Sequence, residues 1–358
     1  MKRFNRFAAT GFALVCLAAA SSLAAQTPTP QAAWQGTRLA FVGRMVKDLD
    51  RSVAFYKMLG FTQDPLAKPV WRTDPVVEGL YGTHGFTTRM AKMYVVNADS
   101  GQHFVVYLRE VKGIKRTDRS HHTAWDPGVT HFGLVVPDAD QLWANLSAAG
   151  LLHARSWGGK LIAPPGQTKG MLAYLTDPDG LDIEIINQRP ATPAQNGRPA
   201  QPGWLPGVNH LGVVILDSNK AKAFYAGTLG GAWPTTPSPW LKGDFYDSAV
   251  GGHGNVLRFF NVNFPEEIAP NLTMHLELVE FQNRKRAPQR PRITDIGVGY
   301  IGLQVPNLDQ ALSQVLAAGA TQVSRPGIVT MRSGTREVMV RDPDTGVFLE
   351  LFAQPAAR

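Results

Sequence analysis

Two histidines occupy the same place in a strand-like sequence that occurs four times. The copies VTHFGLVV and VNHLGVVI contain His131 and His210, and the copies LAFVGRMV and VGYIGLQV have Phe41 and Tyr300 at that position. A Gly follows two residues later in every copy. Because side chains alternate between the two faces of a strand, this Gly shares a face with the preceding side chain and leaves room there for a ligand. Each imidazole could therefore bind a ligand, or it could be a core His with satisfied hydrogen bonds.

The second half of the chain repeats the first. Residue pairs that lie 169 positions apart include Phe55 and Phe224, Tyr56 and Tyr225, Trp71 and Trp240, His84 and His253, and Arg89 and Arg258. Chance does not maintain one offset across such different residue types. We therefore expect a duplication, with one domain at 38–189 and another at 207–354, joined by the linker 190–206, which is rich in Pro, Ala and Gly.

Each half divides again into two units with the same order of elements. A strand is followed by a helix that begins at an Asp and ends at a Gly, as at 48–60 and 138–150, and then by extended segments. Turns that contain Asp-Pro-Asp, at 177–180 and 342–346, precede the final strand of the second and fourth units. The sequence thus predicts an α+β protein of four βαβββ modules, which we number in chain order.

The first 25 residues have the features of a secretory signal peptide. Basic residues precede an apolar run at 8–20, and small residues follow at 22 and 24. We therefore expect a periplasmic or secreted protein, with no membrane span after cleavage because the apolar run is short. The only cysteine, Cys16, lies in this segment, so the mature chain would have no disulfide and no thiolate metal site. Cleavage would lower the formal charge from +8 to about +5, which does not suggest a nucleic-acid partner.

These patterns resemble the vicinal oxygen chelate superfamily, which includes glyoxalase I, type I extradiol dioxygenases, and fosfomycin and bleomycin resistance proteins. The most specific parts are the repeated first strand, the segment DLDRSVAFYKMLGF at 48–61 and the segment TDPDGLDIEII at 176–186. The resemblance implies two tandem domains with curled mixed β-sheets, in which two modules form a cleft. It also implies that metal ligands come from the first and last strands of the modules.

The resemblance assigns ligand positions module by module. The first-strand positions are Phe41, His131, His210 and Tyr300, and the last-strand positions are Tyr107, Glu184, Glu277 and Glu350. The second and third modules therefore have both ligands, the fourth has one, and the first has none. Imidazoles and carboxylates hold a divalent ion such as Fe, Mn, Ni or Zn and leave positions for substrate oxygens. We expect such an ion as the cofactor.

Two pairings of the modules are open. Pairing within halves, which we favour, gives the second half a site of His210, Glu277 and Glu350, with Tyr300 in the remaining position. Pairing across the linker would instead assemble all four ligands of the second and third modules, two His and two Glu as in glyoxalase I. In a glyoxalase-like reaction, a metal-bound glutamate would be the catalytic residue that transfers a proton, and the candidates are Glu277, Glu350 and Glu184.

Further residues are candidates for substrate binding. The loop 251–254 and its counterpart at 82–85 are each followed by an Arg, and they could bind an anionic group, close the cleft or serve as scaffold. An aromatic residue in a matching loop could stack on a substrate or cap a core. The candidate substrate-binding residues are Tyr300, Arg258, Trp240 and His253.

Two functions from different classes fit these observations. The first is an exported, metal-dependent enzyme that acts on a small molecule with vicinal oxygens, either as a glyoxalase-like lyase or isomerase or as an extradiol-type dioxygenase. The alternative is a binding protein without chemistry, similar to bleomycin resistance proteins. Incomplete ligand sets and the aromatic residues Phe41, Tyr107 and Tyr300 at ligand positions support that alternative.

Overall fold

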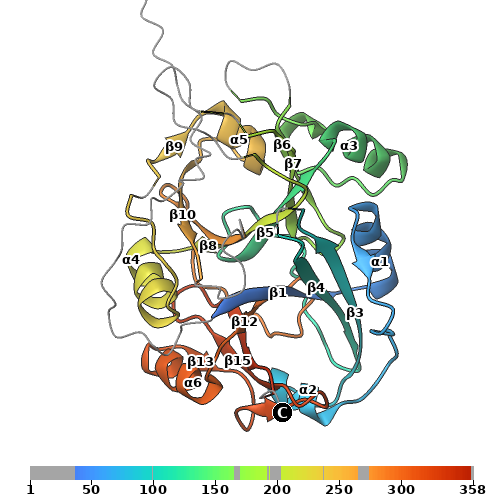
Figure 1. The fold of residues 1–358 in the computed structure, drawn as a ribbon, viewed down its shortest axis with the longest axis vertical. Coiled ribbons are helices and arrows are strands. Elements are labelled where there is room, and N and C mark those ends of the chain that lie inside the picture. Colours follow the sequence, from blue (N-terminus) through green and yellow to red (C-terminus); the bar gives the residue numbers. More distant parts are fainter. Residues whose placement is uncertain are drawn as a thin grey trace, which may run out of the picture.

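The computed structural model describes residues 37–98, 100–164, 170–191, 193, 203–236, 238–264 and 274–355. The expected signal peptide at 1–25 and most of the linker 190–206 lie outside these residues. The chain forms two curled mixed sheets with helices packed against them, which confirms the predicted α+β class (Figure 1). Within the described residues, no helix is both long and apolar enough to cross a membrane.

The four modules follow one another along the chain. The first consists of β1 (Arg38–Val46), α1 (Leu49–Met58), β2 (Thr62–Gln63), α2 (Pro75–Tyr81), β3 (Thr87–Val96) and β4 (His103–Lys112). The second consists of β5 (Gly128–Val136), α3 (Ala139–Ala148), the short 3-10 turn η2 (Trp157–Gly159), β6 (Leu172–Thr176) and β7 (Asp182–Asn187). The third consists of β8 (Gly207–Ile215), α4 (Ser218–Ala221) with its π-helical continuation η3 (Lys222–Thr228), β9 (Leu241–Lys242), α5 (Asp244–Val250), β10 (Val256–Val262) and β11 (His275–Phe281). The fourth consists of β12 (Gly299–Gln304), α6 (Leu308–Ala317), β13 (Thr321–Gln322), β14 (Val329–Thr330), β15 (Arg336–Arg341) and β16 (Phe348–Ala353).

The main helix of every module begins at a polar side chain that caps it. Asp48, Asp138, Asp217 and Asn307 each accept a hydrogen bond from a backbone N–H of the first helical turn. Such caps satisfy backbone donors that have no partner within the helix. A glycine with positive φ follows each of these helices, which lets the chain turn back towards the sheet.

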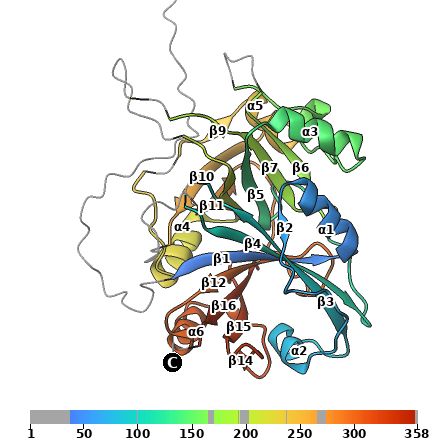
Figure 2. The ribbon, with the colours of Figure 1, turned by 45° about the vertical axis from the view of Figure 1, so that its right-hand side comes forward.

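The two sheets do not coincide with the two halves of the sequence. One has the strand order β6-β7-β5-β8-β11-β10-β9 and combines the second and third modules, while the other, β13-β15-β16-β12-β1-β4-β3-β2, combines the fourth and first. In each sheet the first strands of the two modules pair with each other: β5 is antiparallel to β8 (Figure 1), and β1 is antiparallel to β12 (Figure 2). The pairing within halves that we favoured is therefore not the one these sheets form. Since every first strand offers the same antiparallel edge, the strand pattern alone left its partner open.

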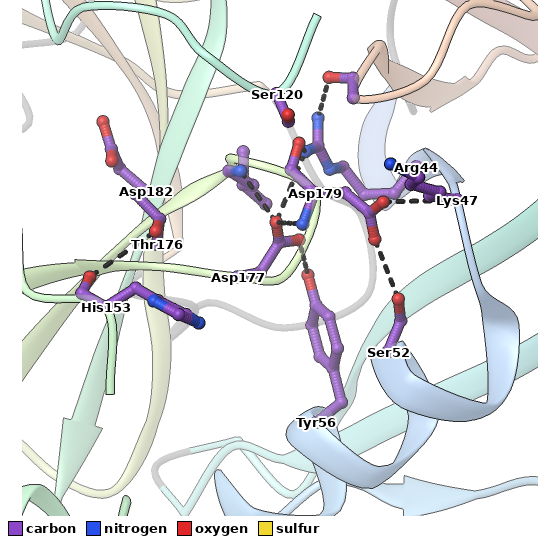
Figure 3. Close-up of polar contacts among 12 residues, drawn as sticks. Arg44, Lys47, Ser52, Tyr56, Ser120, His153, Thr176, Asp177, Asp179 and Asp182 are labelled. Atoms are coloured by element: carbon purple, nitrogen blue, oxygen red, sulfur yellow. Dashed lines mark hydrogen bonds and ion pairs between the residues drawn. The ribbon is translucent and has the colours of Figure 1, made fainter. Parts of the chain in front are cut away.

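Modules of the same half contact each other through a helix and a turn. Tyr56 on α1 donates a hydrogen bond to Asp177 of the Asp-Pro-Asp-Gly turn at 3.1 Å, and Ser52 donates one to Asp179 at 2.8 Å (Figure 3). The buried Arg44 donates to the Asp179 carbonyl at 3.0 Å. In the second half, Tyr225 is likewise buried beside Asp342, whose charge helps to raise the pKa of the tyrosine. The two longest motifs that carried the family resemblance thus join modules.

The inner faces of the two sheets, meaning those with the four repeated first-strand positions, differ in their packing. The sheet of modules one and four has one continuous apolar cluster there, which includes Phe41, Tyr300 and Phe352. The sheet of modules two and three has two separate clusters, one around Leu172 and one around Phe281. Polar side chains lie between these two clusters.

Candidate metal centre

Four polar side chains from four strands converge on the inner face of the sheet of modules two and three. The Nε2 atoms of His131 on β5 and His210 on β8 are 3.1 Å apart. His131 Nε2 lies 3.4 Å from Glu277 Oε1 on β11, and His210 Nε2 lies 3.2 Å from Glu184 Oε2 on β7. At most 15% of any of these side chains is exposed. The structure thus brings together all the predicted ligands of the second and third modules.

Strand register explains this convergence. In the antiparallel β5–β8 pair, His131 lies opposite Gly212 and His210 opposite Gly133. The parallel neighbours place Glu184 beside Gly133 and Glu277 beside Gly212. Each histidine therefore lies across the glycine of the other module and next to that module's glutamate.

The glycines are required because the imidazole of the other module fills the space over them. A Cβ atom at Gly133 would lie 2.2 Å from His210 Cε1, and one at Gly212 would lie 2.0 Å from His131 Cε1. Both separations are far below an ordinary van der Waals contact. The space that the sequence predicts over each glycine is thus occupied by the imidazole of the other module's histidine.

The donor atoms fit a single divalent ion. Bonds of about 2.1 Å at octahedral or tetrahedral angles separate neighbouring ligand atoms by roughly 3.0–3.4 Å. The three measured separations all fall in that range. His131, His210 and Glu277 form a group whose ligand atoms lie within 4.8 Å of one another. Glu184 adds a fourth ligand atom, which lies 3.2 Å from His210 Nε2. A dication would also neutralise the two buried carboxylates, which are costly when unpaired.

Electrostatics link the histidines to the carboxylates. Burial opposes a charge on His210, but Glu277 and Glu184 outweigh it and raise the pKa of His210 above its usual value. Burial likewise opposes ionisation of Glu277, yet His210 and His131 lower its pKa to about 2. Without a metal, the cluster therefore favours a protonated imidazole next to ionised Glu277. Because a metal binds the neutral imidazole, it must displace that proton.

Tyr174 on β6 is a further residue of the centre that the sequence reasoning missed. It lies in register with Glu184, and its side chain hydrogen bonds with that carboxylate. Burial and Glu184 raise the pKa of Tyr174 well above its usual value, so the hydroxyl stays protonated and acts as the donor. Such a donor orients a metal-binding carboxylate. Strand alternation places Tyr174 on the correct face, but only the β6–β7 register shows that it meets Glu184.

An apolar pocket adjoins the centre at His131 and Glu184. The strands contribute Leu172, Val214, Phe259 and Phe281, and α5 contributes Phe245 and Ala249. The pocket lies between the two apolar clusters of this inner face, next to the polar atoms of the centre. A small molecule there would have an apolar wall on one side and metal-binding groups on the other.

The remaining predicted site residues lie elsewhere. Glu350 and Tyr300 belong to the sheet of modules one and four, so the structure does not bring them to His210. Arg258 forms an ion pair with Glu280, and Trp240 packs over its guanidinium at 4.4 Å. The exposed His253 packs against the ring of Trp157 at a tilted angle, with 4.0 Å between the ring centroids. Among the described residues that line the pocket, none of these four predicted substrate-binding residues occurs.

Strand alternation is the reason for the position of Arg258. Leu257 and Phe259, its neighbours on β10, both line the pocket, so Arg258 points to the opposite face. The loop 251–254 serves the fold, because Asp247 accepts hydrogen bonds from the N–H groups of Gly254 and Asn255 at 2.6 and 2.7 Å. Of the roles considered for this loop, which were anion binding, closing the cleft and scaffold, these contacts agree with the scaffold role.

The other sheet contains a filled copy of the centre. A Cβ atom at Gly43 would lie 1.9 Å from the Tyr300 ring, and one at Gly302 would lie 2.3 Å from the Phe41 ring, as the histidines do in the first sheet. Phe41 also packs edge-on against Tyr107 at 4.9 Å. Aromatic rings therefore occupy the space that the metal ligands occupy in the sheet of modules two and three.

Glu350 is held in this filled copy without a metal. Burial and the neighbouring Glu337 raise the pKa of Glu350 well above its usual range, so Glu350 is protonated and hydrogen bonds with Glu337. Arg109 lies close enough to both groups to oppose that rise, and it also hydrogen bonds with Tyr300. A proton and a guanidinium thus resolve the cost of burying this carboxyl group.

Comparisons with known proteins identify a family model and similar structures. Residues 38–185 match the family model described as Glyoxalase/Bleomycin resistance protein/Dioxygenase superfamily. The structure is similar to that of glyoxalase I from Zea mays, with a TM-score of 0.53 and 19% identity over 88% of this chain and 92% of the maize chain. A dioxygenase-like protein from Bacillus subtilis gives a TM-score of 0.47 and 14% identity over 90% of this chain and 87% of that chain. No curated protein matches the sequence.

The maize structure shares the fold across nearly the whole chain. The family model covers the first half, and the second half repeats the first at an offset of 169 residues. These findings confirm the resemblance that the motifs indicated. The family model of the glyoxalase/bleomycin resistance/dioxygenase superfamily, the vicinal oxygen chelate proteins, thus matches residues 38–185.

Proposed function

We propose that this protein is a divalent-metal-dependent enzyme that acts on a small molecule with two vicinal oxygens, as a glyoxalase-like lyase or isomerase. The observation that carries the proposal is the convergence of two His and two Glu side chains from four strands. Four protein ligands leave two positions of an octahedral ion for the two substrate oxygens. An ion bound there would act as a Lewis acid that makes the carbon next to a substrate carbonyl more acidic.

The protein's own residues divide the remaining work. His131 and His210 would hold the ion through neutral imidazole nitrogens. Glu184 accepts a hydrogen bond from Tyr174, which holds that carboxylate in one orientation. Glu277, on the opposite side of the two histidines, is the carboxylate that would take the proton from one substrate carbon and return it to the next. The low exposure of the centre keeps water away from that proton.

The ligand set favours proton transfer over ring cleavage. Non-heme iron oxygenases typically use two His and one carboxylate and keep the other positions open. Here two carboxylates contact the histidines, so one position fewer remains for dioxygen beside a bound substrate. An extradiol-type reaction is for this reason the less favoured member of the two enzyme classes.

Deuterium incorporation tests the proposal. Metal-loaded protein is incubated in D2O with hydroxyacetone or 2-hydroxyacetophenone, and exchange at the carbon next to the carbonyl is followed by NMR. We expect metal-dependent exchange that is lost in Glu277→Gln and retained in Glu350→Gln, which serves as the matched control in the other sheet. Binding of these ketones without exchange in the metal-loaded protein would support the non-catalytic binding function instead.

We also propose that the protein is exported. The basic start, the apolar run at 8–20 and the small residues at 22 and 24 support this proposal. Amino-terminal sequencing of protein from its native host should find a mature chain that begins after residue 25 or close to it. Recovery of the intact amino terminus from the cytoplasm would contradict export.

A further inference from the structure

The pocket lies on only one side of a centre that is otherwise nearly symmetric. The first strands of modules two and three contribute equivalent histidines, and each module contributes a glutamate. Yet among the described residues of the centre, His131 and Glu184 line the pocket, whereas His210 and Glu277 do not. A substrate that bridges the centre and the pocket therefore has a fixed orientation, with its larger group on the side of His131.

The lining residues disfavour a negatively charged group. Among the described residues that line the pocket, none is Lys or Arg, and the acidic ones are Glu184 and Asp182. Asp182 already forms an ion pair with Arg155, so that arginine is engaged. An anionic group in the pocket would approach Glu184 with no Lys or Arg in the described lining to balance it, which is costly in a site of low dielectric. Uncharged apolar groups match the remaining walls.

The size of the pocket limits the apolar group. Its cavity volume is about 60 Å³. Each water molecule needs roughly 10–15 Å³ on this scale, so the cavity holds about five waters or a group of similar size. A single ring or a short branched alkyl group fits these dimensions.

Hydrogen bonds fix helix α5, which lines the pocket, to the sheet. Ser156 donates to the carbonyl of Ala249 at 2.9 Å and accepts from the N–H of Tyr174 at 2.7 Å, which ties α5 to β6. In the other sheet, Ser324 makes equivalent bonds: it donates to the carbonyl of Leu80 on α2 at 2.8 Å and accepts from the N–H of Met339 on β15 at 2.7 Å. The two helices thus sit in the same way over their sheets.

A difference in side-chain size between these helices explains why one pocket is open. Ala249 and Val250 of α5 correspond, at the offset of 169 residues, to Leu80 and Tyr81 of α2. Leu80 and Tyr81 are buried in the apolar cluster that fills the other sheet's inner face. The smaller residues of α5 leave that volume free, so the pocket is a property of the sequence of this helix.

We propose that the substrate carries an uncharged apolar group, a single ring or a short branched alkyl chain, next to its vicinal oxygens. This group lies beneath α5 on the side of His131. The inference rests on the proposed function for the role of the oxygens, but the pocket itself is independent of the metal. It excludes substrates whose group at this position is anionic.

Hydroxamates test this inference, because they share one uncharged chelating group with two vicinal oxygens. Calorimetry with the Zn²⁺-loaded protein compares acetohydroxamate, benzohydroxamate and the monohydroxamate of succinate. We expect benzohydroxamate to bind at least tenfold more tightly than acetohydroxamate, and the succinate derivative to bind less tightly than acetohydroxamate. Equal affinities of the first two, or a preference for the anionic one, would overturn the inference.

A variant that copies the closed helix provides the second arm. Ala249→Leu introduces the residue that α2 has at this position, and Ser248→Leu adds the same side chain to α5 at a position that does not line the pocket. We expect the phenyl preference to fall at least fivefold in Ala249→Leu and to persist in Ser248→Leu, with the zinc content of both unchanged. An unchanged preference in Ala249→Leu would contradict the assigned location.

Failure of the proposed function would give a different result. If the protein does not bind zinc, NMR of benzyl alcohol with metal-free protein still reports on the pocket. Binding that is lost in Ala249→Leu supports the apolar subsite even then. Absence of benzyl alcohol binding to the metal-free protein, together with no phenyl preference in the zinc-loaded protein, would refute the subsite while leaving the metal centre intact.

Discussion

The substitution Gly212→Ala tests whether the repeated glycines exist to admit the histidine of the other module. A Cβ atom at this position would lie 2.0 Å from Cε1 and 2.1 Å from Nδ1 of His131. The ring must therefore retreat by about 1.5 Å to reach an ordinary contact of about 3.5 Å. Metal–ligand distances tolerate only about 0.2 Å, so His131 should cease to be a ligand.

We expect Gly212→Ala to weaken metal binding at least about 100-fold, which corresponds to about 2.7 kcal/mol. Extra volume in a packed core also costs about 1–3 kcal/mol of stability. Competition with a chromophoric chelator measures the metal affinity, and urea unfolding of the metal-free protein measures the stability.

Gly43→Ala is the matched control. Its Cβ atom would lie 1.9 Å from the Tyr300 ring, so it produces the same overlap in the other sheet. We expect a similar loss of stability from Gly43→Ala but an unchanged metal affinity. Wild-type metal affinity in Gly212→Ala, or equal losses of affinity in both variants, would refute the reasoning.

Three further predictions concern residues that hold the fold together. Burial raises the pKa of Glu337 from 4.5 to about 7, so this group stabilises the fold fully below pH 4.5 and loses that contribution as the pH rises through about 7; Glu337→Gln should remove this pH dependence in urea titrations, and an unaltered pH profile would contradict it. Arg109→Met should lower the free energy of unfolding by at least about 2 kcal/mol; the loss should be smaller than the roughly 3–5 kcal/mol typical of a fully buried pair, because Arg109 is partly exposed. Adding Glu337→Gln to that variant should restore part of this stability without any change in metal content. Tyr56→Phe removes the buried hydrogen bond to Asp177 and should cost about 1–3 kcal/mol by the same assay, whereas a neutral effect would show that the contact between α1 and the turn is dispensable.

Much of the fold could be predicted from the sequence because its signals are local. The capping residue Asp48, the helix-ending Gly60 and the turn at 177–180 each specify backbone geometry within a few residues. The repeat then extended those local signals to four modules. The types of the ligand residues were also readable, because His131 and His210 stand at one repeated position.

The assembly of the site could not be predicted in the same way. Each first strand has a glycine that accepts the side chain of another first strand, and a Phe, Tyr or His ring fills that space equally well. Antiparallel backbone pairing is likewise the same for β1, β5, β8 and β12. The partner of each strand therefore depends on contacts between distant residues. One such contact is that of Arg44, which donates a hydrogen bond to the Asp179 carbonyl.

The substrate-binding residues were the least predictable part of the site. Arg258 and Trp240 looked suited to a ligand, but strand alternation turns Arg258 away from the pocket and Trp240 packs over it. The pocket depends instead on small side chains such as Ala249, which are inconspicuous in a sequence. Their effect appears only once α5 is placed over the sheet.

The metal content of variants from both halves of the chain tests the central claim most directly. We expect one divalent ion per chain after reconstitution with Zn²⁺, measured by inductively coupled plasma mass spectrometry. The ion should be lost in His131→Ala from the first half and in His210→Ala from the second, and retained in Glu350→Ala. Loss of the ion in Glu350→Ala together with its retention in His131→Ala would contradict a centre shared between the second and third modules.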